Sequence, residues 1–247
     1  MPEFEVEDAL VDVPVKGGAY KAYRAVPRGG GPQPGVIVIP DFRGLADHPN
    51  DIARRLAKAG YVALAVDLFS RSEPLADPND MAALFDRMQK LSDRKAVEDL
   101  QAAERYLHGL SQVGARHVGV IGFCMGGLYA LLLACASETL HAAVDFYGML
   151  RYAQTTPEKP LSPVERTPGL RCPLLGLYGE EDELIPLAHV RELEERLGKE
   201  GKNFEIHTYA GCGHAFFNDT RPDAYRPVAA RDAWEKTIRF FAENLRA

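Results

Sequence analysis

The chain has 247 residues, of which 46% are hydrophobic and 26% are charged, proportions that exclude a disordered, collagen-like or disulfide-scaffold protein. Its net charge of −6, without any basic stretch, argues against nucleic acid as a partner. The longest apolar run, residues 128–136, is too short to cross a bilayer, so no membrane association is expected.

The N-terminal residues alternate in polarity around Gly17 and Gly18, which predicts a β-hairpin. Short apolar runs then alternate with segments of helical periodicity, a pattern typical of a parallel sheet with helices on both faces. Because no segment resembles a linker, we expect one domain over residues 1–247. The predicted strands after the hairpin cover residues 36–39, 61–66, 117–121, 141–147, 173–178 and 203–209. Helical stripes, each expected to face the core, cover residues 52–59, 81–91, 96–107, 190–197 and 234–245.

The segment 122–126, Gly-Phe-Cys-Met-Gly, lies between a predicted strand and an apolar helix. This G-x-C-x-G pattern matches the sharp strand-to-helix turn called a nucleophile elbow, with Cys124 in place of serine. Glycines permit the close approach of strand and helix, and the helix N-terminus favours a thiolate. The alternative interpretation is an ordinary buried thiol beside a glycine-rich turn.

Two later loops supply partners for such a nucleophile. In α/β-hydrolases an acid and then a histidine follow the nucleophile along the chain, each after a strand. Asp182 follows the predicted strand 173–178, and His214 follows the strand 203–209. His214 would accept the Cys124 proton and Asp182 would orient the imidazole. Asp145, near the end of strand 141–147, is an alternative acid.

Backbone groups of the same turns predict an oxyanion hole. The amide of Met125, directly after the nucleophile, is one expected donor, and the amide of Phe42, after the first parallel strand, is the other. The histidines and cysteines show no spacing typical of metal ligands, so neither a metal nor a cofactor is expected.

The chain resembles the dienelactone hydrolase (carboxymethylenebutenolidase) family of α/β-hydrolases. This resemblance implies an α/β-hydrolase fold and a Cys-His-Asp triad at Cys124, His214 and Asp182. It also implies hydrolysis of a small enol-lactone or activated ester through a thioester acyl-enzyme. The matching stretches are residues 36–44, 60–68, 119–127, 145–148, 179–186 and 213–216.

The chain departs from the family pattern at several positions. Asp41 replaces a glutamate that contacts the resting thiol in the family, and it would either gate the thiol or only pair with Arg43. The family arginines that hold a substrate carboxylate align near Leu84 and Asn218. We expect Arg43, Arg71 or Arg87 to substitute, because guanidinium groups bind carboxylates well.

Other pocket features are also implied by the resemblance. Tyr147 matches a pocket-edge tyrosine, and Phe216 together with Phe42 could line an apolar wall. The segment 153–168, rich in proline, threonine and charge, resembles an inserted loop that either overhangs the pocket or is a surface excursion.

Two other functions are open at this point. The altered residues are compatible with a binding or thiol-redox-sensing module, and peptidase or thioesterase activity on the same scaffold is not separable by sequence. The acidic N-terminal segment and the scattered cysteines favour the cytoplasm. The expected assembly is a monomer or a small homo-oligomer.

Overall fold

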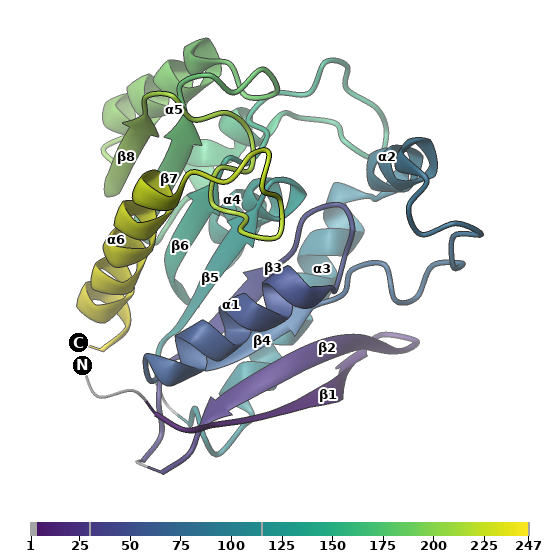
Figure 1. Ribbon diagram of the computed structural model, residues 1–247, viewed down its shortest axis with the longest axis vertical. Helices are drawn as coiled ribbons and strands as arrows, with labels where there is room; N and C mark the ends of the chain where they lie inside the picture. Colours follow the sequence, from purple (N-terminus) through teal and green to yellow (C-terminus); the bar gives the residue numbers. More distant parts are fainter. Residues whose placement is uncertain (1–3, 30, 115, 247) are drawn as a thin grey trace.

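The computed structural model describes residues 4–29, 31–114 and 116–246. One eight-stranded sheet has the order β1-β2-β4-β3-β5-β6-β7-β8 (Figure 1). Strands β1 and β2 form the predicted hairpin, β2 pairs antiparallel with β4, and all later neighbours pair in parallel. The strands are β1 Val6–Val15, β2 Gly18–Pro27, β3 Gly35–Ile39, β4 Val62–Val66, β5 Val118–Phe123, β6 Leu140–Phe146, β7 Leu174–Gly179 and β8 Phe204–Tyr209.

Helices cover both faces of this sheet, as the sequence predicts (Figure 1). Helices α1 and α6 pack on one face, and α3, α4 and α5 pack on the other. Strand β3 shows why its apolar run is continuous: Val36 and Val38 join one core, and Ile37 and Ile39 join the other. The helices are α1 Asp47–Lys58, α2 Met81–Lys90, α3 Asp93–His108, α4 Met125–Ala136, α5 Leu187–Lys199 and α6 Pro227–Leu245, with a 3₁₀ helix, η1, at Pro163–Gly169.

Helix α2 differs from the other helices, and its expected core-facing stripe is confirmed only in part: Leu84 joins the core and Met88 and Leu91 pack against it, but Met81 is exposed. Asp80 caps the helix by accepting hydrogen bonds from the amides of Ala82 and Ala83, but Leu84 is its only buried residue. The helix projects from the body of the molecule instead of lying on the sheet (Figure 1). Met81 and Phe85 are 42% and 40% exposed, and they line a cavity.

Among the described residues, no helix combines the length and the apolar character that crossing a bilayer requires.

Candidate active site

The turn between β5 and α4 holds Cys124 in a strained conformation. Its φ of 57° and ψ of −115° place a non-glycine residue at positive φ, which costs about 1–3 kcal/mol. The flanking glycines make this turn possible. A Cβ atom on Gly122 would lie 1.9 Å from the Gly126 carbonyl oxygen, and one on Gly126 would lie 2.0 Å from that of Ile39. The sequence thus builds a tight turn that presents Cys124 at the N-terminus of α4.

His214 and Asp182 come together at the same edge of the sheet. Asp182 follows β7 and His214 follows β8, and the His214 Nδ1 lies 2.8 Å from Asp182 Oδ2. The other carboxylate oxygen accepts hydrogen bonds from the amides of Leu184 at 2.8 Å and Ile185 at 3.0 Å. These bonds fix the carboxylate, and the carboxylate in turn fixes the ring.

The second ring nitrogen of His214 is the one available to Cys124, which lies beside the ring. His214 Nε2 is buried and makes no well-aligned hydrogen bond within the described residues. Burial on its own lowers the pKa of His214, but the hydrogen bond to Asp182 and the adjacent Cys124 sulfur outweigh it and raise this pKa from 6.5 to about 10. An imidazolium between a carboxylate and a sulfur is therefore favoured at neutral pH.

This shift predicts a pH-dependent contribution of Asp182 to stability. Because the folded pKa of His214 lies above the unfolded value, the contribution is fully present below about pH 6.5 and is lost as the pH rises to about 10. An Asp182→Asn variant should be less stable than the wild type by about 1.5–3 kcal/mol near pH 6.5. Urea unfolding of both proteins should show this difference shrinking towards pH 10.

A matched control comes from the neighbouring acid. Glu181 is exposed, so Glu181→Gln should change the free energy of unfolding little at either pH. If the free energy of unfolding of Asp182→Asn differed from that of the wild type by the same amount at pH 6.5 and pH 10, the assigned charge state of His214 would be contradicted.

Cys124 and His214 open into a cavity of about 610 Å³. Apolar side chains from α2, including Met81, Phe85 and Met88, line one part of it. The segment 153–159 contributes Lys159 and other residues, so the sequence-predicted insertion does reach the cavity. Among the described lining residues there are arginines and a lysine but no aspartate or glutamate. The charged residues of the lining are therefore all cationic, and Arg43, Lys159 and Arg221 each pair with an acid that does not line the cavity.

The two residues whose backbone amides are expected to form an oxyanion hole belong to the lining of this cavity. Phe42 and Met125 both line it, and Met125 is the first residue of α4, where an amide has no intrahelical partner. Neither amide donates a hydrogen bond to another described residue. Both N–H groups are therefore available to a ligand.

The other sequence candidates are distributed unevenly around the cavity. Arg43 and Tyr147 line it, but Arg71, Arg87 and Phe216 do not. Arg71 pairs with Asp99, Arg87 lies 4.1 Å over the Phe69 ring, and Phe216 is buried beside Tyr147 and Tyr209.

Asp41 is engaged with its own turn. Its Oδ1 accepts a hydrogen bond from the Arg43 amide at 2.8 Å, and its Oδ2 lies 3.6 Å from the Arg43 guanidinium. Asp41 is not among the residues that line the cavity. Of the two roles open to it from the sequence, this geometry favours pairing with Arg43.

Two cationic residues of the cavity, Arg221 and Lys159, are not predicted from the sequence. Arg221 lies a short distance after His214 in the chain, just beyond the aligned Asn218 position, and Lys159 lies within the 153–168 segment. The only sequence signal for either is position: Arg221 shares the loop of the histidine, and Lys159 occurs in an insertion. The spacing of neither residue indicates a role.

Asp145, the alternative acid, has a different environment. It is fully buried in β6, where it accepts hydrogen bonds from the Tyr178 hydroxyl at 2.7 Å and the Gly148 amide at 2.8 Å. Burial raises its pKa to about 6. These bonds indicate a structural role. Within the described residues, no group of histidines, cysteines and acids could hold a metal ion.

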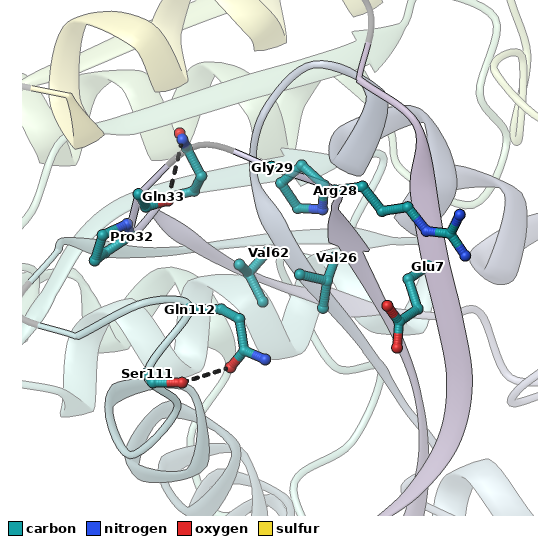
Figure 2. A pocket seen from close by; sticks show the side chains of 11 residues that line it. Glu7, Val26, Arg28, Gly29, Pro32, Gln33, Val62, Ser111 and Gln112 are labelled. Atoms are coloured by element: carbon teal, nitrogen blue, oxygen red, sulfur yellow. Dashed lines mark hydrogen bonds between the residues drawn. The ribbon is translucent and has the colours of Figure 1, made fainter.

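A second hollow, of about 400 Å³, lies where the parallel strands begin, since Gln33 precedes β3, Val62 begins β4 and Gln112 precedes β5. Figure 2 shows its side chains. Glu7, Arg28, Gln33, Ser111 and Gln112 are its polar residues, and both Gln33 and Ser111 already have hydrogen-bond partners. Its described lining includes no cysteine or histidine. Ligands of open α/β sheets bind at the carboxyl ends of the strands, which favours the first cavity as the active site.

Comparison with known proteins gives consistent results. A family model described as "Dienelactone hydrolase family" matches residues 20–245. A Bradyrhizobium protein named "Probable 2-oxo-3-(5-oxofuran-2-ylidene)propanoate lactonase" is 38% identical, covering 95% of this chain and 94% of that protein. A crystal structure from Klebsiella pneumoniae, named "Putative Dienelactone Hydrolase", is 32% identical with a TM-score of 0.90, covering 97% of this chain and 99% of that one. The expected α/β-hydrolase fold is confirmed.

Proposed function

The chain belongs to the dienelactone hydrolase family, whose members hydrolyse lactone and ester bonds, and on this premise we propose that it acts through a Cys124–His214–Asp182 triad. One observation carries the proposal: the His214–Asp182 pair and the strained Cys124 turn meet at one cavity. Turnover of an activated ester by the wild type and by a Cys124→Ala variant tests it directly.

The first half of the reaction acylates the cysteine. The Cys124 thiolate attacks the carbonyl carbon, and the carbonyl oxygen, now negative, accepts hydrogen bonds from the amides of Met125 and Phe42. When the intermediate collapses, the C–O bond breaks and the leaving oxygen takes the proton of the His214 imidazolium. In a lactone that oxygen remains attached to the acyl chain, so the ring opens and a thioester is left on Cys124.

The second half releases the product. Water attacks the thioester carbonyl while the neutral His214 accepts its proton, and the same amides stabilise the oxyanion. The C–S bond then breaks, which frees the carboxylic acid and restores the thiolate–imidazolium pair. Asp182 holds the ring in one orientation through both halves.

The cations of the cavity indicate the substrate class. Among the residues that the structure describes, the one ion-pair partner of Arg221 is Asp223, which is 72% exposed, so this surface pair holds the arginine weakly. Arg43 lies 4.8 Å over the Phe42 ring, next to the proposed oxyanion donor. The lactone in the name of the Bradyrhizobium relative carries a carboxylate. We infer that this chain also prefers lactones or esters with a free carboxylate, which Arg221 and Arg43 bind.

Arg221→Met tests the substrate class. Because a hydrogen bond to a charged group contributes about 1.5–3 kcal/mol, KM for a carboxylate-bearing lactone should rise about tenfold or more. KM for the uncharged ester p-nitrophenyl acetate should change little. Arg171→Met is the control, since Arg171 pairs with Glu138 on the surface and does not line the cavity. Equal effects of Arg221→Met on both substrates would contradict carboxylate recognition.

A further inference from the structure

The segment 153–161 is exposed along almost its whole length, yet it forms a wall of the cavity. Three residues of this segment line the cavity although they are solvent-exposed: Ala153, Gln154 and Thr156. Lys159 is its one residue that is partly buried. A wall with so little packing of its own needs specific bonds to stay in place.

Lys159 supplies those bonds. Its Nζ donates to the Leu91 carbonyl oxygen at 2.9 Å, to the Tyr129 hydroxyl at 2.9 Å and to Asp93 Oδ1 at 3.3 Å. An ammonium group has three N–H donors, so all of them are used. This full set of bonds makes Lys159 a structural anchor and leaves it no donor for a substrate, in contrast to Arg221.

The partners of Lys159 are themselves fixed on the main body of the fold. Tyr129 belongs to α4, the helix that begins at the Cys124 turn, and Asp93 is in the first turn of α3. The Tyr152 hydroxyl donates to Asp93 at 3.0 Å, and the Asp93 amide donates to the Glu158 carbonyl oxygen at 3.0 Å. The wall is thus connected to the helices that support the nucleophile.

This group of residues is shielded from water. The side chains of Lys159 and Asp93 are 12% and 6% exposed, and the ammonium lies 5.4 Å from the centres of both the Tyr129 and the Tyr152 rings. A shielded ion pair with every donor satisfied has a defined geometry, unlike a surface pair. It can therefore hold the segment at a fixed distance from the reacting carbonyl.

We propose that Lys159 is a specificity-determining positioning residue: with Asp93, Tyr129 and Tyr152 it holds segment 153–161 as a fixed wall that limits the size of the acyl group hydrolysed at Cys124. The inference rests on the proposed placement of substrate in this cavity. When the anchor is lost, the wall moves outward and larger acyl groups fit, whereas a small acyl group gains nothing.

The test compares two p-nitrophenyl esters, the acetate and the octanoate, in a Lys159→Met variant. The ratio of kcat/KM for octanoate to that for acetate should rise about tenfold, mainly through a lower KM for octanoate, while kcat for acetate stays within about threefold. Because Tyr129 and Tyr152 still donate to Asp93 in this variant, the carboxylate keeps partners and the protein should fold.

Two further variants separate positioning from stability. The Lys202 ammonium also bonds a loop, by donating to the carbonyl oxygens of Pro168 and Leu170, but Lys202 does not line the cavity. Lys202→Met should therefore leave the ratio of kcat/KM values unchanged. Tyr152→Phe removes one hydroxyl from the group and should shift the ratio by a smaller factor, even if Lys159→Met does not fold.

An unchanged ratio in folded Lys159→Met, with only a lower unfolding temperature, would overturn this inference. The proposed triad would survive that result, since its own test is the loss of turnover in Cys124→Ala. Retained turnover in Cys124→Ala would instead contradict the triad itself.

Discussion

Replacing Cys124 with alanine should lower kcat for p-nitrophenyl acetate by about three orders of magnitude or more. Loss of the nucleophile removes the covalent route, and only the oxyanion donors and the binding groups are left to assist water. The variant should fold normally, because alanine is smaller than cysteine and, carrying the same Cβ atom, adds no strain to the backbone of the turn. Steady-state release of p-nitrophenol measures the effect.

The chain provides its own control for this substitution. Cys135 lies near the other end of the same helix, α4, and burial raises its pKa to about 12, so it is a poor nucleophile. Cys135→Ala should keep kcat within about threefold of the wild type. Wild-type turnover by Cys124→Ala would remove the cysteine from the mechanism.

Gly126→Ala should lower the free energy of unfolding by about 3 kcal/mol or more. An added Cβ would lie 2.0 Å from the Ile39 carbonyl oxygen and 2.6 Å from the Pro40 carbonyl oxygen, and neither backbone group can move without disturbing β3. The same shift would displace the loop that carries Phe42. Activity should therefore fall together with stability, and urea unfolding with an ester assay tests both.

Gly198 offers the opposite case within a helix. It lies in α5, and a Cβ added there would meet nothing within 4 Å. Gly198→Ala should therefore raise the free energy of unfolding by about 0.5–1 kcal/mol, because alanine loses less conformational freedom in a helix. If the urea midpoint of unfolding were the same for Gly126→Ala and the wild type, the close packing of strand and helix at the turn would be contradicted.

The fold could be predicted from the sequence because its signals are local. Strands covered on both faces are apolar at every position, as in Val36–Ile39, and this marks them as members of a parallel sheet. The Cys124 turn was predictable for the same reason, since Gly122 and Gly126 lie within five consecutive residues of the chain. His214 and Asp182 followed from strand order, because the carboxyl ends of parallel strands share one edge.

Features set by distant contacts were not predictable in this way. The apolar stripe of α2 resembles that of a core helix, and only the tertiary structure shows Met81 and Phe85 at the cavity. Lys159 carries no local sign of burial, because its partners Asp93 and Tyr129 belong to helices that are distant in the chain. Arg71 and Arg87 are plausible carboxylate ligands by residue type, but Arg71 pairs with Asp99, Arg87 stacks on Phe69, and neither lines the cavity.

Trapping the acyl group tests the mechanism most directly. The protein is mixed with excess p-nitrophenyl acetate and quenched in acid within the first turnovers, and its peptides are then analysed by mass spectrometry. The proposed triad predicts one acetyl group per chain, attached to the peptide that contains Cys124 and released by hydroxylamine as a thioester is. An acetyl group on a different residue, or turnover at full rate with no acylated peptide, would contradict it.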